Sequence, residues 1–195
     1  MAFLRSVTSS ETGPVLYGRE IMLRIPTATD YAGWAELRAR SREFLTPWEP
    51  AWTRDELSRA AFRRRLRYYQ KELREETGYA FLLFRQYDEA LLGGISLSNV
   101  RRGVTQSCSI GYWVGAPFAN KGHMTDAIWG VIPFVFEALG LHRLEAACLP
   151  GNQASIRVLE KTGFRAEGRA RNYLKINGVW QDHLLFALLR EDCRY

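Results

Sequence analysis

The sequence predicts an α/β protein with one central mixed sheet, mostly antiparallel, that is flanked by helices. Strand-like and helix-like segments follow each other in the order β-α-α-β-β-β-α-β-α-β-β. Three of the strand-like segments are joined by short turns, which is typical of antiparallel pairing. A long apolar helix then separates two strands, and such a crossover gives one parallel step. With 195 residues and 47% hydrophobic content, the chain is long enough for one domain with a sizeable core.

The N-terminal residues contribute little to this pattern. Residues 1–14 are largely polar, and we expect a flexible segment there, followed by a single domain over residues 15–195. The first residues lack the apolar run of a leader peptide, and no stretch approaches the roughly 20 apolar residues that cross a bilayer. We therefore expect a cytoplasmic protein that does not bind a membrane.

A strand and two helices come first. Residues 20–25 alternate apolar and polar side chains, as a strand does. Thr29 or Asp30 can cap a helix over residues 31–40. A second, strongly basic helix is expected over residues 54–77, because a glycine follows it.

The segment between these helices contains two prolines, Pro47 and Pro50. Proline has no backbone donor and holds the residue before it extended. Regular helix is therefore excluded here, and Trp48 and Glu49 are expected to lie in a stiffened loop.

The remaining segments alternate between the two types of structure. Strands are predicted over residues 79–86, 91–99, 106–114, 143–149, 164–176 and 179–189. Helices are predicted over residues 124–139, despite Pro133, and 153–162. The pair Asn177-Gly178 joins the last two strands and is the strongest short hairpin signal in the chain.

The net charge of +6 predicts a surface that attracts polyanions. Within the basic helix, residues 54–75 include the cluster Arg63-Arg64-Arg65-x-Arg67, a candidate contact for the ribosome or RNA. Clusters of this kind are more often a solvated helix face. The surface charge alone does not choose between nucleic acid, an acidic protein and a cofactor that carries phosphates.

Metal sites and disulfides are not indicated. The three cysteines, Cys108, Cys148 and Cys193, lie far apart in the sequence. The histidines His123, His142 and His183 also lack the spacing of metal ligands. We expect all three histidines to be structural.

Two segments carry candidate chemistry. Residues 118–125 form a turn with Gly122 that opens a helix, and backbone N–H groups at a helix start favour an anion such as a pyrophosphate. Asn152 and Ser155 begin a later helix, where they can cap its free amides. Either segment alone is also explained as an ordinary helix start.

In their order and separation, these two segments resemble the GCN5-related N-acetyltransferase (GNAT) family, over about residues 20–189. Segments 44–50, 95–100, 142–146 and 173–183 resemble, more narrowly, the ribosomal-protein-alanine N-acetyltransferases of the RimJ/RimL type. The resemblance implies the GNAT fold, acetyl-CoA as cosubstrate and no metal.

The resemblance also implies the residues that hold the cosubstrate. The family's pyrophosphate turn falls on residues 119–124, where Ala119 and Met124 depart from the family's polar and small residues. Lys121 adds a positive charge to this turn. The implied binding residues are Trp113, Val114, Ala119, Asn120, Lys121, Gly122, His123, Met124, Thr125, Asn152 and Ser155. Ser155 is expected near the sulfur, where its hydroxyl returns a proton to the thiolate.

A general base is harder to assign. Relatives place a glutamate where this chain has Ser109 or Leu174. Glu49 in the proline-stiffened loop is the leading candidate, with Glu145 and Asp182 as alternatives. A base is not required if the acceptor is an α-amino group, whose pKa of about 7.7–8.0 leaves it partly neutral near pH 7.5.

The resemblance implies acetylation of an N-terminal alanine on a small-subunit ribosomal protein, by a monomer or homodimer. One alternative acceptor is a small amine such as an antibiotic or a polyamine. Another alternative is a ribosome- or RNA-binding module with a vestigial cofactor pocket, whose affinity falls steeply with salt.

Overall fold

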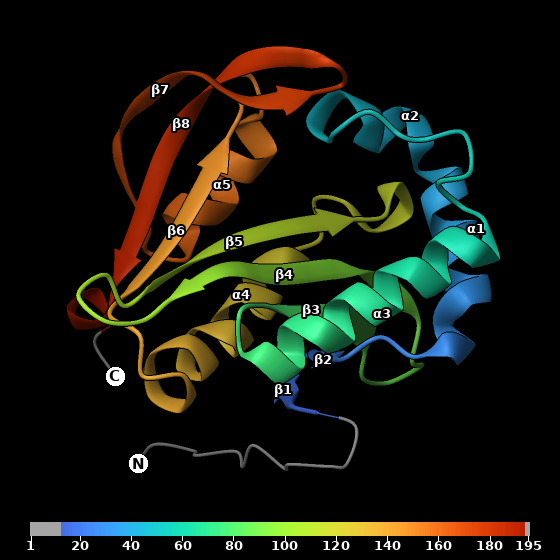
Figure 1. Cartoon of the computed structure of the whole chain (residues 1–195), viewed down its shortest axis with the longest axis horizontal. Coiled ribbons are helices and arrows are strands. Elements are labelled where there is room, and N and C mark those ends of the chain that lie inside the picture. Colours follow the sequence, from blue (N-terminus) through green and yellow to red (C-terminus); the bar gives the residue numbers. More distant parts are fainter. Residues whose placement is uncertain (1–12, 194–195) are drawn as a thin grey trace.

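The computed structural model of the chain describes residues 13–193. A single eight-stranded sheet runs through the molecule in the order β1-β2-β3-β4-β5-β6-β8-β7, as Figure 1 shows. The strands are β1 (Val15–Tyr17), β2 (Ile21–Arg24), β3 (Tyr79–Arg85), β4 (Leu91–Arg101), β5 (Ser107–Val114), β6 (Arg143–Cys148), β7 (Arg165–Ile176) and β8 (Val179–Leu189). The α-helices are α1 (Tyr31–Arg40), α2 (Arg42–Leu45), α3 (Arg59–Glu75), α4 (His123–Pro133) and α5 (Gln153–Lys161).

The predicted fold class is confirmed. Neighbouring strands pair antiparallel except β5 and β6, which are parallel and joined through α4. The predicted element order omitted the short helix α2 and one strand, β1, which pairs with β2 from Val15 opposite Arg24. A three-residue strand is too short to show an alternating pattern, so tertiary pairing alone defines it. The predicted flexible segment, residues 1–14, lies almost entirely outside the described residues.

The basic helix begins later than predicted. We expected helix from residue 54, but α3 starts at Arg59, because Ser58 is extended and its Oγ accepts a hydrogen bond from the backbone N–H of Ala61 at 3.0 Å. This is an N-cap, and it fixes the first turn. The helix ends before residue 77 because Glu76 takes a left-handed conformation with φ 53°.

The helix over residues 124–139 is also interrupted. Regular α-helix ends at Pro133, and Phe134–Ala138 continue as a π-helical turn. Proline cannot donate the backbone hydrogen bond of a regular helix. The backbone N–H of Leu139 instead donates to the carbonyl of Phe134 at 2.9 Å, so the segment stays helical to its end.

Helices cover both faces of the sheet and create two cores. Along β3, Phe81 and Leu83 belong to the larger core, which also contains the buried side chains of α4. Leu82 and Phe84 point the other way, into a smaller core with Trp34 of α1 and the buried residues of α3. Because both faces are covered, β3 is an unbroken apolar run with one partly exposed end.

An opening in the sheet places the functional site. β5 and β6 are paired only over Ser107–Ser109 and residues 143–145, and beyond that point they diverge. Figure 1 shows the two strands separating, with α5 beside the gap. The second half of β5 therefore keeps β4 on one edge and has no partner strand on the other.

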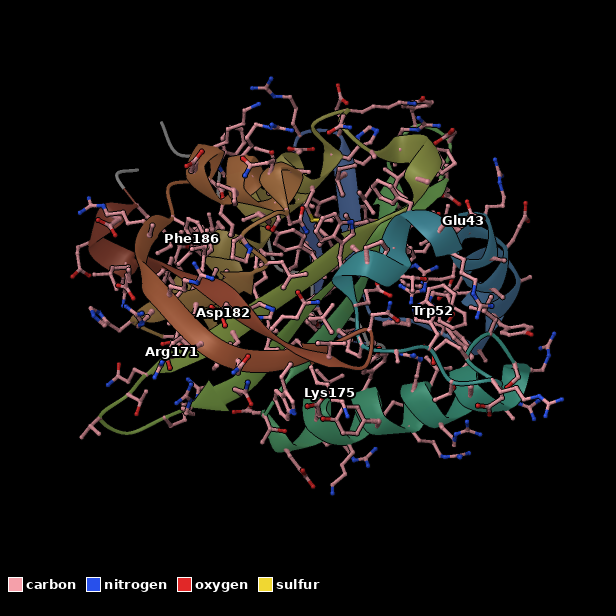
Figure 2. All side chains as sticks on the ribbon, turned by 90° about the horizontal axis from the view of Figure 1, so that it is seen from above. Glu43, Trp52, Arg171, Lys175, Asp182 and Phe186 are labelled. Atoms are coloured by element: carbon pink, nitrogen blue, oxygen red, sulfur yellow. The ribbon has the colours of Figure 1, made fainter. Side chains whose placement is uncertain are left out.

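The hairpin of β7 and β8 reaches across this gap. Its turn has Asn177 at φ 45° and Gly178 at φ 83°, as the predicted Asn-Gly hairpin requires. The backbone N–H of Asn177 donates to the carbonyl oxygen of Glu49 at 2.8 Å. In Figure 2, seen from above, the hairpin crosses the space between α5 and α3, with Arg171, Lys175 and Asp182 along it.

Candidate active site

A cavity of about 720 Å³ occupies the gap between β5 and β6. Its volume lies in the usual range for pockets that bind small molecules and cofactors. The leading candidate base and all the residues implied to hold the cosubstrate line it: Glu49, Trp113, Val114, Ala119, Asn120, Lys121, Gly122, His123, Met124, Thr125, Asn152 and Ser155. The structure thus brings together segments that are more than 100 positions apart in the chain.

The turn before α4 presents a row of free backbone amides to this cavity. Asn120 and Gly122 are both left-handed, with φ 59° and 83°. Within the described part of the chain, the N–H groups of residues 120–125 donate to no protein acceptor. Amides at a helix start combined with left-handed turn residues form a concave anion site.

The side chains around this turn also suit an anion. Lys121 lines the cavity together with Arg157 and Lys161 of α5, whereas Glu49 is the single carboxylate among its described lining residues. The ring of His123 is buried, and its Nε2 has no hydrogen-bond partner within residues 13–193. Burial and the nearby Arg85 lower the pKa of His123, so the ring favours its neutral form. The turn therefore fits the diphosphate of a nucleotide cofactor.

The free edge of β5 supplies further donors. The N–H of Gly115 donates to Leu92 of β4 at 2.8 Å, and the pairing of Gly94 with Trp113 continues this register. Since N–H groups alternate between the two edges of a strand, the N–H of Trp113 points to β4 and that of Val114 points into the gap. Of Trp113 and Val114, the two β5 residues implied to hold the cosubstrate, Val114 is the one whose N–H points into the gap.

Ser155, at the start of α5, forms a hydroxyl pair with Tyr112 of β5. Asn152 is the N-cap, and its Oδ1 accepts from the N–H of Ser155 at 3.1 Å. The Oγ of Ser155 lies 2.8 Å from the hydroxyl of Tyr112, which reaches it from β5. Burial raises the pKa of Tyr112 well above its usual value, so the phenol keeps its proton.

Glu49 occupies the opposite wall. Its two oxygens each accept from a guanidinium nitrogen of Arg38 at 2.7 Å, and one also accepts from Trp52 Nε1 at 2.9 Å. The guanidinium of Arg38 is stacked between aromatic rings, 4.4 Å from that of Trp52 and 4.9 Å from that of Trp113. Glu49 is therefore a fixed anion with three donors on two oxygens.

A second cavity of about 500 Å³ lies on the face of α1 and α3. It shares Glu49, Gly111, Tyr112 and Trp113 with the first cavity, so the two meet at β5. Its remaining wall includes these aromatic and charged side chains: Trp34, Arg38, Trp52, Glu56, Phe62, Arg65, Tyr69 and Phe81. Figure 2 shows Trp52 among the helices on this side.

The two alternative carboxylates lie elsewhere. Glu145 bonds Arg143 at 2.8 Å and Arg101 at 3.3 Å, and Asp182 bonds Arg169 at 2.8 Å. Neither lines either cavity. Both are structural ion-pair partners, so the structure removes them as candidate bases.

Sequence reasoning did not single out three residues that the structure places in the site. The sequence assigned no particular role to Tyr112 or Arg38. His183, expected to be structural, lines the first cavity. The sequence held a partial signal for the orientation of Tyr112. Side chains two positions apart on a strand share a face, and Tyr112 shares with Ile110 and Val114 the face of β5 that is covered by α4 and α5.

Comparisons with known proteins agree with this geometry. A profile of the acetyltransferase (GNAT) domain matches residues 20–165. The chain is 38% identical over 178 residues to the "Probable N-acetyltransferase YjcK" of Bacillus subtilis, covering 91% of this chain and 98% of that protein. It is 31% identical over 172 residues to the ribosomal protein uS5-alanine N-acetyltransferase of Escherichia coli, covering 88% of this chain and 89% of that enzyme.

The solved structures give the same result. Mycobacterium smegmatis RimJ in complex with CoA-disulfide matches with a TM-score of 0.86 and 31% identity, over 93% of this chain and 88% of that chain. The chain belongs to the GNAT acetyltransferase family. It is an N-acetyltransferase related to the ribosomal-protein acetyltransferases, as the resemblance predicted.

Two further findings concern the described residues 13–193. They contain no group of three or more histidine, cysteine or acidic side chains placed to hold a metal ion. They also contain no helix that is both long and apolar enough to span a bilayer.

Proposed function

We propose that the protein transfers the acetyl group of acetyl-CoA to the N-terminal α-amino group of a protein, with the N-terminal alanine of a small-subunit ribosomal protein as the leading acceptor. The observation that carries this proposal is the meeting of two cavities at β5, through Glu49, Gly111, Tyr112 and Trp113. The first cavity, between β5 and β6, suits an anionic cosubstrate. The second cavity, on the face of α1 and α3, suits an amine with an attached chain.

On the cosubstrate side, the amides of residues 120–125 hold the diphosphate and Lys121 adds a point charge. Asn152 lines the path of the pantetheine arm. The N–H of Val114 points toward the thioester oxygen, where it stabilises the negative charge that develops as the amine attacks. Most of this binding uses the backbone, so the departures from the family pattern at Ala119 and Met124 leave it intact.

Ser155 and Tyr112 provide the proton for the departing sulfur. If Tyr112 donates to the Oγ of Ser155, the hydrogen of Ser155 is free to point at the sulfur. Ser155 then gives its proton to the thiolate and takes one from Tyr112. The raised pKa of Tyr112 keeps that proton available throughout the neutral range.

Glu49 stands at the junction of the two cavities and attracts the protonated amine. Three hydrogen bonds already satisfy its oxygens, which argues against Glu49 as the group that removes the proton. We assign it instead to positioning: its charge draws the ammonium to the end of β5, where the amine meets the acetyl group.

The test uses purified protein, acetyl-CoA and peptides that begin with alanine or serine. We expect release of free thiol and a mass increase of one acetyl group on the N-terminal residue. The matched control is the same peptide with a blocked N-terminus and an internal lysine, which should release no thiol. No release above background with any peptide would contradict the proposal. Small amines that outcompete every peptide would favour the antibiotic or polyamine alternative.

The basic helix is a second candidate for partner recognition, by the ribosome or RNA. In α3, Arg64 pairs with Asp55 and Arg65 with Glu56, whereas Arg63 and Arg67 have no ion pair within residues 13–193. These free cations support a contact with phosphate groups that brings the enzyme to its acceptor. Binding of RNA fragments should weaken steeply between 50 and 200 mM salt. Salt-independent or absent binding would reject this contact.

A further inference from the structure

We infer that His183 is the catalytic residue that takes the proton from the acceptor amine. This inference rests on the proposed function and adds to it the general base that the family's usual carboxylate positions do not supply. Here those positions carry Ser109 and Leu174.

The hydrogen bonding of His183 fixes which ring nitrogen is available. The side chain is 2% exposed, and its Nδ1 lies 2.9 Å from the carbonyl oxygen of Gln181. A carbonyl oxygen only accepts, so Nδ1 carries the hydrogen and Nε2 has the lone pair. Tyr173 packs edge-on against the ring, with centroids 5.9 Å apart, and restricts its rotation. With Nδ1 turned to its own strand, Nε2 is the nitrogen at the cavity wall.

The register of β8 places this nitrogen at the opening in the sheet. Leu184 pairs with Cys148, the last residue of β6, so His183 lies just beyond the end of that strand. Leu184 and Phe186 face the larger core, and alternation turns His183 to the opposite face. That face carries Glu49 and the hairpin residues Leu174 and Ile176, which line the same cavity.

The other titratable groups around the cavity do not suit the role. Glu49, from the proline-stiffened loop, is held by three donors. Burial raises the pKa values of Tyr112 on β5 and Cys148 on β6, so both stay protonated. His123 lies in the diphosphate turn.

The remaining ionisable side chains that line the cavity are Lys121, Arg157 and Lys161, which are cations. Tyr173, on β7, contacts the His183 ring edge-on. Imidazole is the side chain suited to exchange a proton near neutral pH, and His183 is the imidazole on the acceptor side.

The resulting step balances. Nε2 takes a proton from the ammonium, directly or through one water molecule, which leaves the amine nitrogen with a lone pair. This nitrogen forms the C–N bond to the acetyl carbon, and the C–S bond breaks. The second proton lost from nitrogen passes to solvent. Ser155 protonates the sulfur and takes a proton from Tyr112, which regains one from solvent. His183 then returns its proton to water.

The test compares His183→Asn with His142→Asn. The first variant keeps an N–H donor for Gln181 and removes the basic nitrogen, while His142 is exposed and pairs with Glu191 at 3.6 Å. We expect kcat of His183→Asn at pH 7 to fall by about 10²-fold to 10⁴-fold, with KM for acetyl-CoA unchanged. The loss should shrink as the pH rises, because the α-amine then loses its proton without help. His142→Asn should behave as wild type.

Two results would overturn the inference. One is a His183→Asn variant with the wild-type kcat and pH profile. The other comes from the wild-type protein, so it does not depend on how a variant folds: nitrogen NMR that shows the His183 hydrogen on Nε2. A wild-type protein that binds coenzyme A but acetylates no amine would instead reject the proposed function.

Discussion

The two cavities that meet at β5 are built in different ways. On the face of α4 and α5, the cavity presents backbone amides of residues 120–125 and the N–H of Val114. On the face of α1 and α3, the second cavity is built from side chains, with Arg38 stacked between Trp52 and Trp113. We therefore expect the proposed cosubstrate side to tolerate substitution, because every residue except proline supplies a backbone N–H, whereas the proposed acceptor side depends on particular side chains.

This difference predicts the largest effect on the acceptor side, for Arg38→Leu. Removing the guanidinium leaves Glu49 without its bidentate partner in a largely buried place, at a cost of about 3 kcal/mol in the free energy of unfolding. Tm should fall by roughly 6–12 °C. The control is Arg40→Leu on the same helix, because Arg40 and Glu36 form an exposed pair at 3.6 Å. That variant should change stability by less than about 0.5 kcal/mol. Equal losses in both variants would contradict the comparison.

The second-largest effect is expected for Tyr112 and Ser155, which we propose supply the proton for the departing sulfur. Tyr112→Phe should lower kcat about 10²-fold and leave the affinity for coenzyme A nearly unchanged. Ser155→Ala should have a similar effect, and the double variant should lose little more, since the two hydroxyls act as one unit. Steady-state kinetics of the three variants measures this. Fully additive losses would show that Tyr112 and Ser155 act independently.

A smaller effect tests whether the backbone holds the diphosphate. Gly122 has φ 83°, and the space that a Cβ would occupy there is open, so Gly122→Val strains only the backbone, by about 1–2 kcal/mol. We expect coenzyme A to bind roughly tenfold more weakly by calorimetry. Lys121→Ala should cost less than about fivefold. Gly140→Val, at φ 66° and outside both cavities, should reduce stability and leave binding unchanged. A larger loss for Lys121→Ala than for Gly122→Val would contradict backbone binding.

The smallest effect is a pH dependence of stability that arises from His123. Its pKa in the folded protein lies below the usual 6.5, mainly because of burial. Below that pH the unfolded chain binds more protons than the folded one, so this contribution to stability is present above 6.5 and decreases as the pH falls. The Tm of wild type should therefore decline more than that of His123→Gln between pH 7.5 and 5.5. Parallel curves would show that His123 does not contribute.

Much of the fold could be predicted because its signals are local. Short sequence patterns were enough to predict three features: the Asn177-Gly178 turn, the parallel step across α4 and the alternating strands. β1 was not predicted because a strand of three residues is too short to show an alternating pattern. The start of α3 was misplaced because it depends on the cap formed by Ser58.

The residues of the candidate site could likewise be predicted only in part. Residues in continuous motifs, such as Gly122 and Asn152, were identified from the sequence and lie together in the cavity. Arg38 and Tyr112 contact residues outside their own elements, and His183 reaches the cavity through the register of β8. Their places in the site therefore depend on strand register and on packing between α1 and the loop that carries Glu49. No spacing rule within one segment reveals such pairs.

The hydrogen bond from the Asn177 N–H to the Glu49 carbonyl has a topological consequence. It joins the tip of the last hairpin to the proline-rich loop and closes a ring of polypeptide beside the opening. A chain end can be threaded into such a ring, whereas a lysine in the middle of a folded surface cannot enter without its flanking backbone. For the proposed acceptor, a chain terminus, this closed loop adds a steric preference to the contacts made by individual side chains.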